Sequence, residues 1–167
     1  LEILAQDSIS SIKRCEVIGR GSQSEVIKVT REFDFALKIL RINAADSMNP
    51  SQTKPSDMEK LKKLLNEYEI ITSLHHPNII ETYGFCFGDS INPPSILLQF
   101  CPHSLQEAIS NMTEIEKVCS IYEISLGMAA VHEAGLIHRD LKPASILIDR
   151  HKHVRVSDFG ISCIEDK

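Results

Sequence analysis

The first forty residues constrain the fold most, because apolar and polar side chains alternate there in three short segments. The segments are residues 14–21 (RCEVIGRG), 25–30 (EVIKVT) and 33–40 (FDFALKIL). Alternation with a period of two is typical of β-strands, whose successive side chains point to opposite faces. The third segment places four large apolar residues on one face: Phe33, Phe35, Leu37 and Ile39. The turns between the segments are short, so we predict an antiparallel meander.

The pattern changes after the third segment. Residues 43–57 are polar and contain two prolines, which predicts a loop. Residues 58–74 then carry apolar side chains at helical spacing over about four turns. Ser56 or Asp57 is expected to cap this helix, and Pro77 to end it.

The rest of the chain mixes strands and helices. The sequence TEIE, which begins at Thr113, fits a capping box and predicts a helix that ends near His132. This helix has an apolar stripe, which includes Ile115, Val118, Ile121, Ile124, Leu126 and Ala129. Four further strands are predicted, at residues 78–87, 95–100, 145–149 and 153–159. We therefore predict an α+β fold in two lobes, with a five-stranded antiparallel sheet and one helix in the first.

Composition excludes some classes of function. The net charge of −5 argues against a broad surface for nucleic acid or an anionic membrane. Apolar runs are too short to span a bilayer, and we expect no signal peptide. The five cysteines are scattered and include no CxxC pair, which argues against a zinc site. Their odd number favours free thiols in a reducing, cytoplasmic environment.

Gly19 and Gly21 lie between the first two predicted strands, in the sequence GRGSQSEV. Glycines at this spacing allow backbone N–H groups to approach a phosphate without obstruction from a Cβ atom. A plain hairpin turn explains the same pair equally well. The segment is not a Walker loop, because no GK[ST] follows, and it leads into a strand rather than a helix.

Lys38 stands inside an apolar strand, where an unpaired ammonium group is costly to bury. Glu67 lies on the same helical stripe as Leu64 and Ile71, so its carboxylate is a possible partner. The alternatives are an edge lysine facing water and a solvated glutamate.

Asp140 lies between two strand-like segments, and Asp158 comes at the end of another, in the sequences HRDLKPAS and SDFG. Aspartates at such positions can bind a divalent cation or act as a base. Each has an ordinary alternative, since aspartate is common in turns.

Taken together and in this order, these motifs resemble the protein kinase catalytic domain of the serine/threonine type. The resemblance rests on the glycine-rich loop, Lys38, Glu67, the segment HPNII at residues 76–80, and the HRDLK and DFG motifs. It implies an ATP-dependent kinase that uses Mg²⁺ and phosphorylates serine or threonine hydroxyls of a protein substrate. It further implies that Asp140, Lys38 and Lys142 are catalytic and that Asp158 and Ser145 bind the metal. The implied ATP-binding residues are Gly19, Gly21, Ser22, Ser24, Val26, Ala36, Lys38, Glu67, Leu98, Gln99, Cys101 and Leu147.

Two residues depart from the family pattern. Ser24 replaces the third glycine of the loop, and Ser145 stands where the family has a metal-binding asparagine. We expect weakened binding of a second metal ion rather than loss of ATP binding. A nucleotide-binding regulatory pseudokinase therefore remains an alternative, and a non-catalytic interaction fragment is a third.

The chain ends seven residues after Gly160, so the resemblance implies a domain cut short soon after the DFG motif. We expect a lead-in at residues 1–13, a small lobe at 14–100 and an incomplete helical large lobe at 101–167. A fragment of this kind is expected to be inactive as a kinase when it is alone. Arg139 beside Asp140 is a candidate partner for a phosphate added by an upstream activating kinase.

Overall fold

A computed structural model describes residues 13–20, 23–30, 34–41, 55–88 and 92–164. The chain divides into two compact units, the first formed by residues 1–68 and 82–100 and the second by residues 69–81 and 101–167. Residues 69–81 belong to the second unit, although they precede residues 82–100 of the first. Most of the expected lead-in, residues 1–12, and residues 43–54 of the predicted loop lie outside the described residues.

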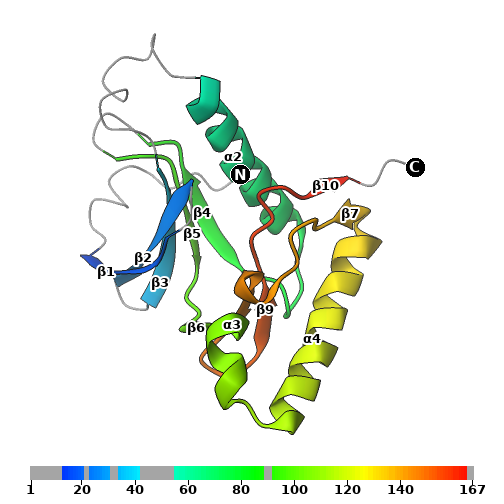
Figure 1. Ribbon diagram of the computed structural model, residues 1–167. Coiled ribbons are helices and arrows are strands. Elements are labelled where there is room, and N and C mark those ends of the chain that lie inside the picture. Colours follow the sequence, from blue (N-terminus) through cyan, green and yellow to red (C-terminus); the bar gives the residue numbers. More distant parts are fainter. Residues whose placement is uncertain (1–12, 21–22, 31–33, 42–54, 89–91, 165–167) are drawn as a thin grey trace. The chain divides into compact units, whose positions relative to one another are not determined.

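The first unit contains a five-stranded antiparallel sheet (Figure 1). Its strands are β1 (Lys13–Arg20), β2 (Ser24–Thr30), β3 (Asp34–Leu40), β4 (Thr82–Cys86) and β5 (Ser95–Gln99). The meander of β1, β2 and β3 is confirmed, and β5 lies between β3 and β4. The predicted strand at 78–87 is shorter in the structure, because Ile79 bridges to Val156 within the second unit.

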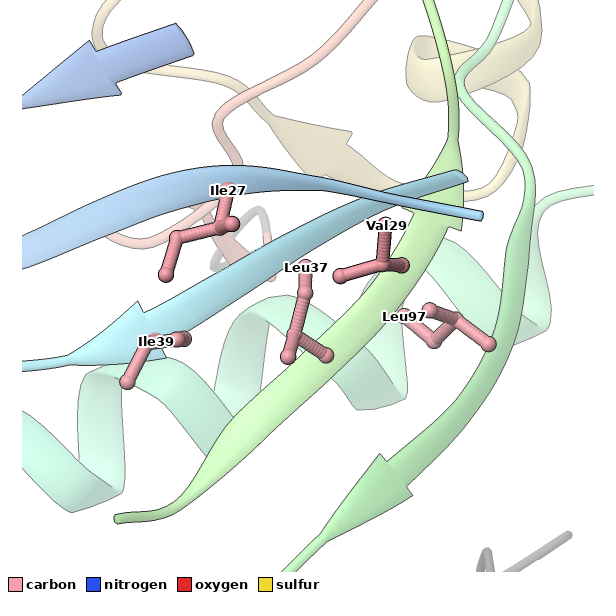
Figure 2. Packing of buried hydrophobic residues seen from close by; sticks show 5 residues of the cluster. All are labelled: Ile27, Val29, Leu37, Ile39 and Leu97. Carbon is pink, nitrogen blue, oxygen red and sulfur yellow. The ribbon is translucent and has the colours of Figure 1, made fainter. Parts of the chain in front are cut away.

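One face of this sheet carries a buried apolar cluster (Figure 2). The cluster consists of Ile27, Val29, Leu37, Ile39 and Leu97. The strand register explains it, since Leu37 is opposite both Ile27 and Leu97. Phe35 packs against the cluster as predicted, while Phe33 lies outside the described residues.

Helix α2 (Pro55–Ser73) begins three residues before the predicted start. The prediction that Ser56 or Asp57 caps it is wrong, because both residues lie inside its first turn. Proline is well suited to this position, since its fixed φ matches the helix and its missing N–H is not needed there. Asp57 is buried and forms an ion pair of 2.6 Å with Lys60, one turn further along.

The second unit is built around helix α4 (Glu114–Glu133), and its predicted capping box between Thr113 and Glu116 is confirmed. A second capping box, between Ser104 and Glu107, starts the short helix α3 (Leu105–Ala108), which precedes the 3-10 turn η2 (Ile109–Asn111). The turn η3 (Pro143–Ser145) leads into β8 (Ile146–Ile148). This strand lies between β6 (His103–Ser104) and β9 (Val154–Val156) in a three-stranded sheet. Strands β7 (Leu136–Ile137) and β10 (Cys163–Ile164) form a separate pair.

Helix α4 has two contrasting faces. Gly127 lies on the buried face, where a Cβ atom would be 2.8 Å from the carbonyl oxygen of Asn78 and 3.0 Å from Cγ2 of Val156. Glycine is therefore what lets α4 approach β9 so closely. The predicted apolar stripe is largely exposed in the described part of the chain, notably at Ile115, Val118 and Ile121. Within the described residues, no helix combines the length and apolar character needed to cross a membrane.

Candidate active site

Four of the predicted ATP-binding residues share one face of the five-stranded sheet, opposite to the apolar cluster. Val26 is the register partner of Lys38 on the neighbouring strand, and Ala36 is the partner of Leu98. Lys38 and Ala36 lie two residues apart on β3, so all four side chains point to the same side. Ala36 and Leu98 are buried there, and Val26 is partly buried. The face thus combines small and apolar side chains with the ammonium group of Lys38, while Lys28, also on this face, pairs with Asp34 at 3.2 Å.

Lys38 and Glu67 form the ion pair that the sequence predicts. The lysine Nζ donates to both carboxylate oxygens at 2.7 Å. The side chain of Glu67 is 4% exposed and that of Lys38 is 14% exposed, so both charges depend on each other for compensation. The pair joins β3 to α2 and thereby fixes the direction of the lysine side chain.

The remaining predicted ATP-binding residues of the first unit are Gly19, Gly21, Ser22, Ser24 and Gln99. Gly19 lies within β1 opposite Val26, and Ser24 begins β2. Gln99 is opposite Phe35 and therefore points to the face of the apolar cluster; its buried Oε1 has no hydrogen-bond partner in the described part of the chain. Gly21 and Ser22 lie outside the described residues.

In the second unit, the loop after β7 is organised around His138, which is 1% exposed. The backbone N–H of Asp140 donates to Nδ1 of His138 at 3.2 Å, so the proton of the neutral ring lies on Nε2. Nε2 then donates to the carbonyl oxygen of Ser157 at 2.9 Å. The ring also packs on buried Phe159, with 4.8 Å between the ring centroids.

Asp140 and Lys142 form an ion pair at the surface of the second unit. Lys142 Nζ lies 2.5 Å from Oδ2 of Asp140, and both side chains are partly exposed. The hydrogen bond to Asp140 raises the pKa of Lys142, and the charge of Asp158 adds to the effect. A carboxylate with a cation beside it suits a group that orients a hydroxyl and meets developing negative charge.

Asp158 comes directly before buried Phe159 and is partly exposed. Within the described residues, no three histidine, cysteine or acidic side chains cluster to form a complete metal site. Asp158 still fits a magnesium ligand, because Mg²⁺ is usually held by one or two carboxylates plus phosphate oxygens and water. Ser145, the second predicted ligand, is 1% exposed and hydrogen-bonded within its own loop.

Cys101 and Leu147, the remaining predicted ATP-binding residues, also belong to the second unit. Cys101 is buried, and burial raises the pKa of its thiol to about 12, with the charge of Asp149 adding to the effect. Leu147 is partly exposed on β8, opposite Ser104 and Arg155. A thiol that stays protonated is a poor nucleophile, so the side chain of Cys101 is suited to packing. A ligand would be contacted through its backbone groups instead.

Two serines that were not predicted from the sequence support the loop. Ser162 Oγ donates to the carbonyl oxygen of His138 at 3.0 Å, and Ser157 Oγ donates to that of Ser145 at 2.9 Å. Serine is common and makes such bonds at many positions, so no spacing in the sequence could have singled these two out.

Comparison with known proteins agrees with this arrangement. The family model described as the protein kinase domain matches residues 12–167. The chain is 29% identical over 165 residues to a probable serine/threonine-protein kinase of Dictyostelium discoideum, covering 92% of this chain and 11% of that protein. It is 28% identical to the probable serine/threonine-protein kinase CCRP1 of Zea mays, covering 96% of this chain and 25% of that protein. It is 27% identical to mitogen-activated protein kinase kinase 7 of Arabidopsis thaliana, covering 94% and 48%.

The fold and the two sets of charged residues therefore define a protein kinase domain. The chain belongs to the protein kinase domain family. It spans between a tenth and a half of the length of these three relatives.

Proposed function

We propose that the chain supplies the ATP-binding and phosphate-transferring residues of a serine/threonine protein kinase. The observation that carries the proposal is the buried ion pair of Lys38 and Glu67. It holds an ammonium group on the same sheet face as Val26, Ala36 and Leu98. Apolar side chains beside one fixed cation suit a ligand with a flat apolar base and an anionic tail.

Each charged residue has a part in this proposal. Lys38 binds the α- and β-phosphates, and Glu67 keeps its ammonium group in place. Asp140 orients the acceptor hydroxyl and accepts its proton, while Lys142 meets the charge of the transferred phosphate. Asp158 is the carboxylate that would hold Mg²⁺, which when bound neutralises negative charge on the phosphate oxygens. These groups are fixed before reaction, as electrostatic stabilisation of the transition state requires.

The acceptor is proposed to be a serine or threonine of a protein. Two observations support this class: the lysine two residues after Asp140, and the names of the Dictyostelium and Zea relatives. Arg139, which is exposed beside Asp140, is the proposed site where a phosphate added by an upstream kinase would act.

A second candidate is a regulatory pseudokinase that binds nucleotide without transferring phosphate. The observation that favours it is Ser145, which stands in place of asparagine and has its hydroxyl engaged within the loop. The presence of Lys38, Asp140 and Asp158 favours the enzyme.

The deciding experiment measures transfer of labelled phosphate from ATP to a generic protein substrate by the full-length protein. Asp140→Asn is expected to lower the rate at least about 100-fold, because it removes the proton acceptor. Glu114→Gln is the matched control, since Glu114 is an exposed acid paired only with Lys117 in the described residues, and its rate should be unchanged.

Nucleotide binding, measured with and without Mg²⁺, completes this test. Binding without any transfer, in wild type and Asp140→Asn alike, would support the pseudokinase. Absence of binding would contradict both candidates.

A further inference from the structure

The hydroxyl of Ser145 is bound entirely within the loop that carries Asp140. Its Oγ accepts a hydrogen bond from the backbone N–H of Lys142 at 3.0 Å. It also lies 3.0 Å from the carbonyl oxygen of Asp140 and 2.9 Å from that of Lys142, to which it donates. The residue is 1% exposed.

These contacts use most of the hydrogen-bonding capacity of the Ser145 hydroxyl. A serine has one proton to donate and two lone pairs to accept with. The proton is shared between two carbonyl oxygens, and one lone pair takes the N–H of Lys142. The remaining lone pair is buried, so little of Oγ is open to a cation.

The backbone of Ser145 is fixed as well. Its N–H donates to the carbonyl oxygen of Lys142 at 2.9 Å. Its own carbonyl oxygen accepts from both the N–H and the Oγ of Ser157, each at 2.9 Å. Turning the side chain toward a metal would break the bonds of Oγ while the backbone stayed in place. A neutral, buried hydroxyl gains little from that exchange, because Mg²⁺ readily keeps a water molecule instead.

Resting on the proposed function, we propose that Ser145 is a positioning residue of the Asp140–Lys142 segment and does not bind metal. The nucleotide complex of this chain then holds a single divalent cation, on Asp158. Ser145 ties the carbonyl of Asp140 to the N–H of Lys142, which keeps the two charged side chains at their ion-pair distance. The sequence-based expectation that Ser145 ligates a second ion is replaced by a role in loop geometry.

The metal stoichiometry tests this proposal directly. Mn²⁺ is titrated into the full-length protein saturated with a non-hydrolysable ATP analogue, and free Mn²⁺ is followed by electron paramagnetic resonance. One Mn²⁺ per nucleotide is expected, and Ser145→Ala should bind it with unchanged affinity. Asp158→Asn should lose it. Two Mn²⁺ ions in the wild type, with one lost in Ser145→Ala, would overturn the proposal.

Amide hydrogen exchange tests the positioning role without nucleotide or metal. Ser145→Ala should speed exchange at the amide of Lys142 about tenfold, which corresponds to the loss of one ordinary hydrogen bond. Ser120→Ala is the matched control, since buried Ser120 donates to the carbonyl oxygen of Glu116 at 2.9 Å and touches no loop residue through that bond. It should leave Lys142 unchanged. Ser145→Thr, which keeps the hydroxyl, should preserve protection.

The outcomes separate this inference from the proposed function. Unchanged exchange at Lys142 in Ser145→Ala would refute the positioning role even if the protein is an active kinase. A wild-type protein that binds no nucleotide would refute the proposed function, while the exchange result would still decide the role of Ser145. If Ser145→Ala does not fold, the wild-type count of Mn²⁺ decides the question of the metal.

Discussion

The two units fix their charged residues by different means. In the first unit, Lys38 is held by a buried carboxylate on another element, and both side chains are largely withdrawn from water. In the second unit, Asp140 and Lys142 are partly exposed, and the loop beneath them is held by neutral hydrogen bonds through His138 and Ser145. Removing one partner of a buried ion pair leaves the other charge uncompensated, which costs several kcal/mol of stability. Removing one of several neutral hydrogen bonds in a loop costs less, because the other bonds remain. The first unit should therefore be more sensitive to a single substitution.

The largest effect is expected at the ion pair. Lys38→Met leaves the carboxylate of Glu67 buried without its cation and should lower the free energy of unfolding by about 3 kcal/mol. The double variant Lys38→Met/Glu67→Leu removes both charges and should recover most of that loss while still failing to bind nucleotide. Urea denaturation of the full-length protein measures both changes.

Lys63→Met provides the control for this comparison. Lys63 pairs with exposed Glu59 at 3.1 Å on the same helix as Glu67, and such surface pairs contribute under about 0.5 kcal/mol. Equal losses for Lys38→Met and Lys63→Met would show that burial does not set the strength of the first pair.

A smaller effect is expected at His138. His138→Leu keeps an apolar contact with Phe159 but leaves the carbonyl oxygen of Ser157 and the N–H of Asp140 without their partner. The free energy of unfolding should fall by about 2 kcal/mol, the usual cost of leaving buried polar groups unsatisfied. Faster amide exchange at Asp140 should accompany it. His75→Leu, at an exposed position, should change stability by less than about 0.5 kcal/mol, and a larger loss there would contradict this reading.

The smallest effect concerns the contact between α4 and the turn before β9. Nδ1 of His153 lies 2.8 Å from the carboxylate of Glu123, and this hydrogen bond raises the pKa of His153 above its ordinary value of 6.5. A raised folded-state pKa means that protonated His153 stabilises the fold fully below pH 6.5, and that the contribution disappears as pH rises through the raised value. Because His153 is well exposed, the contribution should be under about 1 kcal/mol.

Comparing unfolding free energies at acidic and alkaline pH would measure this contribution. His153→Gln should be less stable than the wild type only on the acidic side. The exposed His151 serves as control through His151→Gln, which should follow the wild type at both pH values. A deficit of His153→Gln that is the same at both would rule out protonation as its cause.

The sequence predicted most of the local elements and the ion pair of Lys38 and Glu67, because both leave local signals. Alternation located β1, β2 and β3, and the spacing of Leu64, Glu67 and Ile71 predicted a carboxylate facing Lys38. It could not predict that β5 would lie between β3 and β4, since that order depends on contacts far apart in the chain. Strands of two residues, such as β7 and β10, are too short to show a period.

Prediction was weakest where function depends on single atoms. Ser145 was expected to bind metal on the basis of its position in a motif, and that motif could not predict the hydrogen bonds of its hydroxyl to two carbonyl oxygens. Ser157 and Ser162 act through the same kind of bond and leave no pattern at all. The start of α2 was misplaced because Pro55, taken as a loop residue, is the first residue of the helix.

Arg139 and Asp158 have φ angles of 67° and 69°, in the left-handed region that residues other than glycine rarely adopt. Each such conformation costs on the order of 1 kcal/mol or more, and it persists only where the surrounding fold enforces it. The backbone next to Asp140 and at Asp158 is therefore strained in the folded chain itself, before anything binds. The free-energy cost of this backbone conformation is therefore part of folding. Binding of a ligand at these residues does not have to supply it.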